Sequence, residues 1–317
     1  MLNRLPVKSK EKGTKIKMNK IVALVVTYNR KNMLKENIES LLNQNTSEFD
    51  ILIVDNASTD GTEELVKSFK NDRIIYKNTG ANLGGAGGFN YGVRLSIEKG
   101  YDYCWLMDDD TIPKNNSLEE LIKNAQNLND EFSYLCSYVE WTDGKPCKMN
   151  MPRIDKNWYE YADKINDSLL KLISCTFVSV FLNLKVVKNL GLPVKEMFIY
   201  GDDHEYTERI GKEKPGYFSF NSVVVHKMGS NTGFDIVNIP KERISRYYYD
   251  SRNRFYRVRK ESFYEKVAYI AWIFITIFRI LGKSKDCKLK RIGVILKGFF
   301  AGIVFNPKLE YVESQEK

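Results

Sequence analysis

Hydrophobic and polar positions alternate along the first half of the chain in blocks that predict strands and helices in turn. Residues 21–26 and 51–54 are unbroken apolar runs, which are typical of strands buried on both faces of a sheet. Residues 74–76 and 103–107 predict two further strands. The intervening apolar residues recur at helical spacing: Leu34, Ile38, Leu41 and Leu42, then Leu65, Val66 and Phe69, then Leu118, Leu121, Ile122, Ala125 and Leu128.

This alternation predicts an α/β fold with a mixed, mainly parallel sheet that helices cover on both faces. Ligands of such sheets bind beyond the carboxyl ends of the strands. Four polar or glycine-rich segments follow the predicted strands, at residues 27–30, 55–60, 82–88 and 108–110. We therefore expect these four segments to line one crevice.

Charge is distributed unevenly along the 317 residues, whose net charge is +9. Residues 1–20 hold 7 Lys and Arg against 1 acidic residue, and residues 241–317 hold 18 against 8, so the middle of the chain is acidic, near −7. A nucleic-acid-binding domain usually carries its basic surface on the fold itself, so this distribution argues against nucleic acid as a partner. It suits an acidic body whose basic ends contact an anionic surface.

The same change in composition divides the chain into three parts. Residues 1–19 are a basic leader that we expect to be flexible, residues 20–240 form the α/β body, and residues 241–317 are a helical, basic and aromatic C-terminal region. The leader has no apolar core of the kind that a signal peptide contains, and Met18 is an alternative start to Met1.

Cysteine usage and hydropathy indicate the cellular compartment in which we expect the protein. The five Cys include no CxxC pair, which is typical of a reducing compartment rather than of a disulfide framework. The longest apolar run, residues 267–278, is shorter than the roughly 20 residues that span a bilayer. We therefore expect a protein of the cytoplasm that does not cross a membrane.

Three consecutive carboxylates, Asp108, Asp109 and Asp110, follow the predicted strand at residues 103–107. At the end of a buried strand their charges repel one another unless a cation lies between them. Hard divalent cations such as Mg²⁺ or Mn²⁺ prefer oxygen ligands and bridge readily to diphosphate oxygens. A solvated acidic turn is the alternative, but the apolar residues before the triplet favour a metal site.

A second acidic cluster, Asp202, Asp203 and Glu205, follows Gly201 at a predicted helix start. Capping of the helix accounts for one Asp but not for the whole cluster. The cluster is suited to an acceptor hydroxyl, with one carboxylate as general base and another as a hydrogen-bond partner. His226 follows a short apolar run and is either a structural histidine or a further metal ligand.

Together these motifs resemble the family 2 glycosyltransferases of the GT-A fold. Residues 25–30, Val-Val-Thr-Tyr-Asn-Arg, and residues 54–61, Val-Asp-Asn-Ala-Ser-Thr-Asp-Gly, are similar to the nucleotide-binding opening of that family, and the Asp triplet lies where its metal-binding Asp-x-Asp motif belongs. Residues 82–90 and 105–111 resemble the galactofuranosyltransferases and their rhamnosyltransferase relatives, and the full triplet favours galactofuranose. The resemblance covers roughly residues 20–230.

The resemblance implies a Rossmann-like GT-A fold, a nucleotide-diphosphate sugar as donor, Mn²⁺ or Mg²⁺ as cofactor, and inversion at the anomeric carbon. It implies that Asp203 is the general base and that Asp202 and Glu205 orient the acceptor. The residues assigned to the donor are Thr27, Asn29, Arg30, Asp55, Asn82, Gly85, Asp108 and Asp109, and those assigned to the metal are Asp108, Asp110 and His226.

The C-terminal region predicts contact with an anionic membrane. Residues 243–260 form either a solvated helix packed on the body or a helix that grips the diphosphate of a lipid-linked acceptor. Residues 266–297 have the composition of an interfacial helix, with a core helix or a homo-oligomer contact as the alternatives. We expect a peripheral protein at the inner face of the cell membrane that extends a polyprenyl-diphosphate-linked glycan during polysaccharide synthesis.

Three other functions stay open at this point. A rhamnosyltransferase using dTDP-rhamnose differs only in the donor. A nucleotidyltransferase also places acidic residues after a strand, but it normally has a basic phosphate-binding loop after the first strand, and residues 27–30 do not supply one. A non-catalytic sugar-binding module would have lost metal or base residues, and both clusters are intact.

Overall fold

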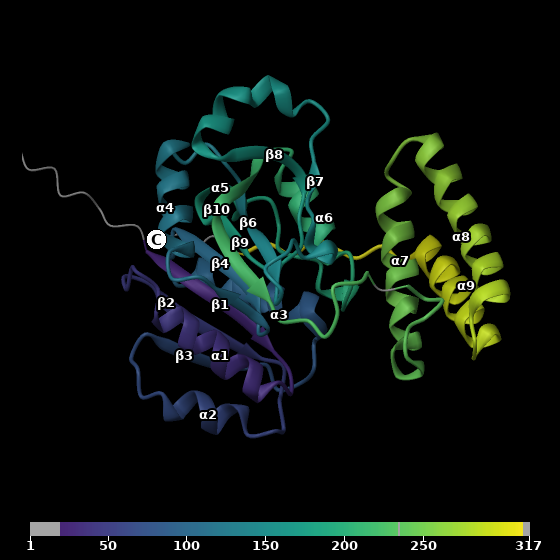
Figure 1. Cartoon of the computed structure of the whole chain (residues 1–317), viewed down its shortest axis with the longest axis horizontal. Coiled ribbons are helices and arrows are strands. Elements are labelled where there is room, and N and C mark those ends of the chain that lie inside the picture. Colours follow the sequence, from purple (N-terminus) through teal and green to yellow (C-terminus); the bar gives the residue numbers. More distant parts are fainter. Residues whose placement is uncertain (1–19, 234, 313–317) are drawn as a thin grey trace, which may run out of the picture.

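The structure, a computed structural model, describes residues 20–233 and 235–312, so the predicted leader at residues 1–19 lies outside the described part. The described residues form an α/β body and a group of three long helices beside it, at the right of Figure 1. All four strands that the sequence predicts are present, each with nearly the predicted bounds.

The strands are β1 (Ile21–Thr27), β2 (Asp50–Asp55), β3 (Ile74–Asn78), β4 (Tyr103–Asp108), β5 (Thr111–Pro113), β6 (Tyr134–Trp141), β7 (Arg153–Ile154), β8 (Leu169–Ser174), β9 (Val180–Asn183) and β10 (Gly216–His226). The α-helices are α1 (Lys31–Leu42), α2 (Thr62–Ser68), α3 (Gly84–Glu98), α4 (Ser117–Asn127), α5 (Leu184–Val187), α6 (Asp202–Ile210), α7 (Tyr247–Val258), α8 (Phe263–Lys283) and α9 (Lys288–Val304). Short 3-10 helices lie at Lys148–Asn150, Trp158–Asp167, Lys195–Met197 and Lys241–Arg246.

One mixed sheet forms the centre of the body, with the strand order β3-β2-β1-β4-β9-β6-β10-β8-β7 and with β5 paired to β10. The first four strands of this order are parallel, as the alternating pattern predicts. Strand β9 is antiparallel to both of its neighbours, β4 and β6, whereas β6 and β10 are parallel to each other. The expected mainly parallel first half is therefore continued by a mixed second half.

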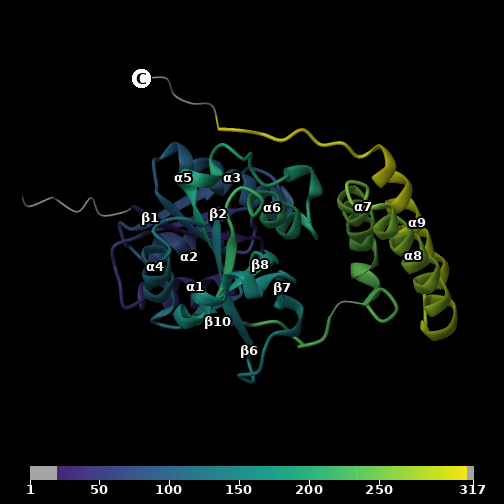
Figure 2. The same ribbon diagram turned by 90° about the horizontal axis from the view of Figure 1, so that it is seen from above.

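Alternate residues of β1 divide the core into two layers. Ala23 and Val25 pack with α1 and α4 on one face, whereas Val22 and Leu24 pack with α3, α5 and α6 on the other. Figure 2 shows the second group of helices together along one side of the sheet. Because both faces of the strand are covered, its sequence is an uninterrupted apolar run.

Two glycines of α3 let this helix lie close to β1. A Cβ atom on Gly88 would be 2.5 Å from Val26, and one on Gly92 would be 2.3 Å from Leu24. Both distances are too short for non-bonded carbon atoms. Part of the glycine-rich segment therefore serves helix–sheet packing, while Gly85 faces open space with nothing within 4 Å of a built Cβ.

The C-terminal helices have a hydrophobic core of their own. Ile244, Tyr247, Tyr269, Ile273 and Ile295 are buried together between α7, α8 and α9. The stretch at residues 266–297, which has the composition expected of an interfacial helix, lies on two helices joined by a short turn. Within the residues that the structure describes, no helix combines the length and the apolar character needed to cross a membrane.

Helix α7 also ties the C-terminal region to the loop that precedes α6. The Asn253 side-chain amide donates to the backbone carbonyls of Met197 (3.0 Å), Ile199 (3.1 Å) and Tyr200 (2.8 Å). Arg252 donates to the carbonyl of Met197 as well (3.2 Å). The Arg252 guanidinium is therefore buried against the protein's own backbone and helps to pack α7 on the body.

Candidate active site

The acidic triplet lies at the carboxyl end of β4, beside the ends of β1 and β2. The parallel register pairs Val26 with Asp108 and Thr27 with Asp55, so these three strands end at the same level. The segments that follow β1, β2 and β4 therefore meet at one edge of the sheet. Asp109 and Asp110 are both buried, which makes their charges costly unless they are balanced.

Two basic side chains and one hydroxyl balance the triplet. Arg30 donates to Asp110 (2.6 Å) and to Asp109 (3.3 Å), and the Thr27 hydroxyl donates to Asp109 (2.8 Å). His226 Nε2 lies 3.0 Å from Asp110 Oδ1. The triplet therefore receives charge and hydrogen bonds from the segment after β1 and from the end of β10.

Unequal pKa values within the triplet follow from this arrangement. Burial, followed by the charge of Asp110, raises the pKa of Asp108 to about 7, and burial raises that of Asp109 to about 6 despite the charge of Arg30. Burial also acts on Asp110, but the hydrogen bond and charge of His226 and the charge of Arg30 outweigh it and lower its pKa to about 2. Burial opposes charge on His226, yet Asp110 raises the pKa of that imidazole to about 9.

Asp108, Asp110 and His226 form a potential metal site. One ligand atom from each lies within 4.8 Å of the other two. Two carboxylates and an imidazole suit Mn²⁺, and the oxygen ligands suit Mg²⁺ as well. The raised pKa values of Asp108 and His226 indicate a surplus of negative charge that a divalent cation would relieve.

Asn150 fixes the orientation of His226 and was missed by the sequence analysis. Its Oδ1 lies 2.8 Å from His226 Nδ1, and its Nδ2 donates to the Thr176 hydroxyl at 2.9 Å. With Nδ1–H donating to this oxygen, Nε2–H donates to Asp110 in the metal-free protein, and a bound metal would take the place of that Nε2 proton, as in metal-binding histidines generally. No motif marks Asn150, because it lies in a short 3-10 helix far from His226 in the sequence.

The predicted nucleotide-binding residues lie along the ends of β1 and β2. Both oxygens of Asp55 accept hydrogen bonds, from the Ser58 amide (2.9 Å) and the Tyr76 hydroxyl (2.7 Å). Asn29 Oδ1 accepts from the Thr59 amide at 2.8 Å, which joins the two loops. In this conformation Asp55 is fully buried and organises the wall of the crevice.

The segment that begins with Asn82 packs against the loop that leads to the second acidic cluster. Asn82 Oδ1 accepts from the Gly84 amide at 2.9 Å, and the Ala86 amide donates to the Phe198 carbonyl at 3.2 Å. Gly84 has a φ of +72°, and a Cβ there would be 2.2 Å from the Phe198 carbonyl oxygen. Glycine is therefore required at residue 84 for both its backbone conformation and its close packing.

The second acidic cluster begins α6, close to the triplet. Burial, followed by the charge of Asp203 and also that of Asp108, raises the pKa of Asp202 well above its usual range. Asp202 is buried, whereas Asp203 lines a pocket of about 630 Å³ together with its neighbour His204. Of the pair, Asp203 is thus the carboxylate that faces the pocket.

Glu205 differs from the role predicted for it. Its two carboxylate oxygens accept from Arg209 Nε (2.8 Å) and Nη2 (3.0 Å), and Arg209 also donates to the Leu192 carbonyl (3.0 Å). The residue is buried in this ion pair. In this conformation the carboxylate anchors α6 to the preceding loop and is not available to orient an acceptor.

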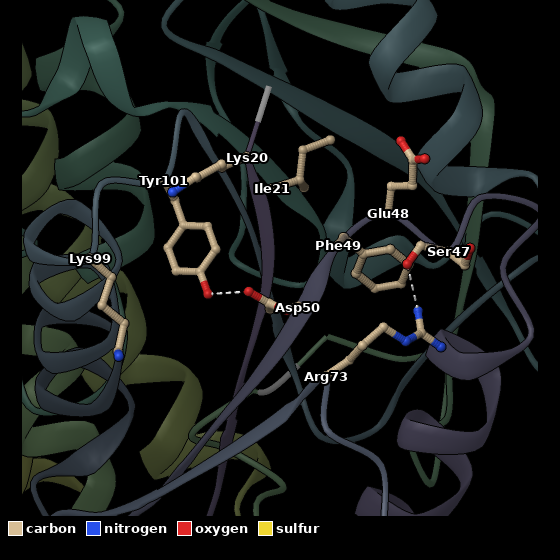
Figure 3. Close-up of a pocket in the computed structure, with 9 residues that line it drawn as sticks. All are labelled: Lys20, Ile21, Ser47, Glu48, Phe49, Asp50, Arg73, Lys99 and Tyr101. Atoms are coloured by element: carbon tan, nitrogen blue, oxygen red, sulfur yellow. Dashed lines mark hydrogen bonds between the residues drawn. The ribbon is translucent and has the colours of Figure 1, made fainter. Parts of the chain in front are cut away.

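A separate hollow of about 500 Å³ lies at the opposite, amino-terminal edge of the sheet, where Phe49 precedes β2 and Asp50 begins it. Figure 3 shows Tyr101 donating to Asp50 and Arg73 donating to the Ser47 carbonyl at its wall. Because ligands of such sheets bind at the carboxyl edge, this hollow is not the candidate site.

Comparison with known proteins gives a family match and several relatives. A family model described as glycosyl transferase family 2 matches residues 22–187. Galactofuranosyltransferase GlfT1 of Mycolicibacterium smegmatis is 25% identical over 201 residues, which cover 60% of this chain and 65% of the relative. Abequosyltransferase RfbV of Salmonella typhimurium is 38% identical over 121 residues, which cover 37% of this chain and 35% of the relative. The matches thus span less than two thirds of either relative.

A solved structure with similar architecture is that of mannosyltransferase PcManGT from Pyrobaculum calidifontis, in complex with GDP-Man and Mn²⁺. Its TM-score is 0.53 at 14% identity, over 82% of this chain and 72% of that chain. At this level of identity the likeness shows the fold, and it confirms the GT-A architecture expected from the sequence.

We expect the Asp110–His226 pair to stabilise the metal-free protein in a pH-dependent way. Because the pKa of His226 is raised to about 9 from 6.5, its contribution is complete below about pH 6.5 and is lost as the pH rises through 9. The difference in free energy of unfolding between the wild type and His226→Gln should shrink by roughly 1–3 kcal/mol between pH 6 and pH 9.5, measured by urea unfolding in EDTA.

The second of the two histidines supplies the control. Burial lowers the pKa of His204, so its contribution should change little above pH 6.5. Equal pH profiles for His204→Gln and His226→Gln would contradict the prediction.

Proposed function

We propose that this chain, which belongs to glycosyl transferase family 2, transfers a sugar from a nucleotide-diphosphate donor to an acceptor hydroxyl in a metal-dependent, inverting reaction. The observation that carries the proposal is the proximity of two acidic sites with different environments. Asp108, Asp110 and His226 are grouped so that they could hold a metal ion, and the charge of Asp108 contributes to the raised pKa of Asp202 at the start of α6.

Asp108, Asp110 and His226 would hold Mn²⁺ or Mg²⁺ through two carboxylates and an imidazole. When bound, the metal neutralises charge on the departing diphosphate. Arg30, whose side chain is 49% exposed, is the protein's own cation at this place and would face the phosphates. Thr27, Asn29 and the segment from Asn82 to Gly85 would complete the donor site.

Asp203 would act as the general base that takes the proton of the acceptor hydroxyl. The raised pKa of Asp202 favours a protonated carboxyl beside it, which reduces repulsion within the pair. A single base with one displacement needs no covalent sugar–enzyme intermediate, and one displacement inverts the anomeric carbon. His204, held by Ser174 at 2.9 Å, lies beside Asp203 in the pocket wall.

Galactofuranose from UDP-galactofuranose is the donor sugar that we propose. Support comes from the motif at residues 82–90 and from the relatives named as galactofuranosyltransferases. A relative named as an abequosyltransferase, and the rhamnosyltransferase-like motifs, make deoxysugar donors the competing class.

We also propose that α8 and α9 attach the protein to the anionic inner face of the cell membrane, where a lipid-linked glycan would be the acceptor. Lys283, Lys288 and Lys290 lie at the turn between these helices and would contact lipid phosphates. Large apolar side chains that are at least two-fifths exposed line the two helices: Phe263, Tyr264, Val267, Ile270, Phe274, Ile275, Phe278, Leu281, Leu289, Phe300, Ile303 and Val304.

Loss of one metal ligand should abolish donor turnover. We expect slow, Mn²⁺-dependent hydrolysis of UDP-galactofuranose by the wild type and at least a 100-fold lower rate for Asp110→Ala, measured as UDP release. The exposed Asp163→Ala variant is the control for loss of a carboxylate. Preference for dTDP-rhamnose or a nucleotide-activated abequose would keep the mechanism and replace the sugar, whereas metal-independent turnover would contradict the metal site.

Substitution of the proposed general base should lower the rate of transfer without weakening donor binding. We expect Asp203→Asn to lower kcat for transfer by about 10²–10⁴-fold while the donor Kd stays within threefold, because only proton transfer is lost. Glu205→Gln is the matched variant on the same helix, and it should lower Tm with little change in kcat because its partner is Arg209. An equal loss of kcat in both variants would contradict this and indicate that Glu205 contacts the acceptor.

Charge placed on the apolar faces should detach the protein from lipid. We expect the Phe274→Glu, Phe278→Glu double variant to lose at least tenfold in sedimentation with phosphatidylglycerol vesicles, since both side chains are exposed on α8. Phe220→Glu, on a β10 residue that is also exposed, is the control. Wild-type protein that fails to sediment with anionic vesicles would overturn the membrane proposal.

A further inference from the structure

The pocket beside Asp203 is bounded on its other side by the C-terminal helices. Tyr200, Asp203 and His204 lie on the catalytic side of this space of about 630 Å³, which is the pocket described above. Its far wall is formed by α7 and α8, including the arginines Arg254, Arg257 and Arg279 together with Tyr247, Trp272 and Thr276. A ligand that fills it therefore contacts both the proposed base and the C-terminal region.

Three polar atoms of this lining are buried and have no hydrogen-bond partner within the described part of the chain. They are the Tyr247 hydroxyl, the Thr276 hydroxyl and Arg257 Nε. Tyr247 is 6% exposed and Thr276 is 1% exposed, so bulk water does not satisfy them. Arg257 Nε only donates, and the two hydroxyls can donate as well as accept, so acceptor oxygens of a ligand could satisfy all three.

Of the three arginines in this wall, Arg254 has the fewest N–H groups engaged by other residues. Its guanidinium lies 4.3 Å from the centre of the Trp272 ring, and its nearest carboxylate, on Asp250, is 3.6 Å away, beyond hydrogen-bonding distance. By contrast, Arg257 donates to Glu208 at 2.6 Å and Arg279 is paired with Asp235. Stacking on an aromatic ring holds an arginine rigidly while leaving its N–H fork free for a planar or tetrahedral anion.

We propose that this pocket binds the phosphate group of a phosphate-bearing amphiphilic acceptor, with Arg254 as the principal ligand and Arg257 and Arg279 beside it. The inference rests on the proposed function, because it assigns a binding site for the phosphate of the proposed lipid-linked acceptor. Phosphate oxygens accept hydrogen bonds without donating any, which matches the unsatisfied donors of the wall. Asp203 on the facing wall would then meet the first sugar beyond the phosphate.

The geometry of α8 places the pocket within reach of a lipid surface. Trp272, Thr276 and Arg279 are spaced four and three residues apart, so they share the face of α8 that lines the pocket. Phe274 and Phe278 lie on the opposite, exposed face. The two faces are separated by one helix diameter, about 10 Å, which is comparable to the depth of the headgroup layer above the acyl chains.

The experiment measures binding of farnesyl diphosphate, farnesol and inorganic pyrophosphate by calorimetry, in EDTA so that a metal-dependent donor site cannot hold a diphosphate. We expect farnesyl diphosphate to bind at least tenfold more tightly than farnesol. Arg254→Gln should remove most of that difference, and Arg254→Lys should restore part of it. Arg259→Gln, which removes a charge from the same stretch of chain but outside the pocket, should keep it.

Each other outcome overturns the inference. Equal binding of farnesol and its diphosphate, or equal losses in Arg254→Gln and Arg259→Gln, would exclude a phosphate site at this wall. Binding of pyrophosphate as tightly as farnesyl diphosphate would make the ligand a free phosphate rather than a lipid. Mn²⁺-dependent donor binding is measured on the same variants: if it is intact when the phosphate site fails, the proposed function stands without this acceptor class.

Discussion

The negative charge gathered at the end of β4 is the constraint on which the site depends. Three adjacent carboxylates at a buried strand end are tolerated only with counter-charge, which the chain supplies from two distant segments. Arg30 comes from the start of α1, and His226 comes from the last residue of β10. The register that pairs His226 with Thr111 across β5 and β10 brings the imidazole to the triplet. The charge cluster thus needs the mixed second half of the sheet, because the parallel half alone would lack His226.

Much of the parallel half and its edge could be predicted from the sequence, for a physical reason. Strands covered on both faces must be apolar throughout, so residues 21–26, 51–54 and 103–107 are distinct from the amphipathic helices around them. Parallel strands joined by helices all end at one edge, which gathers the segments after them without knowledge of any side-chain contact. The grouping of Asp108, Asp110 and His226 follows from the same logic combined with the family resemblance.

The parts that the sequence did not reveal depend on pairings between distant residues. Asn150 has no motif, and its role becomes visible only when its carboxamide is found against the imidazole of His226. Glu205 has the composition and spacing of a site residue, but the choice between an acceptor and Arg209 is decided by tertiary structure. Antiparallel β9 is a short apolar strand that cannot be distinguished from a parallel one by its pattern.

The hydrogen bonds from α7 to the loop before α6 have a consequence for how such proteins can be recombined. Phe198 and Tyr200 have positive φ angles, of 64° and 67°, that non-glycine residues rarely adopt unaided. Asn253 supplies donors to the carbonyls around them, so the geometry that leads into Asp203 is set partly by a helix outside the family-matched residues. A chimera that takes its C-terminal region from a relative therefore needs a carboxamide at the position of Asn253, because without it the loop before α6 loses the hydrogen bonds that hold its backbone.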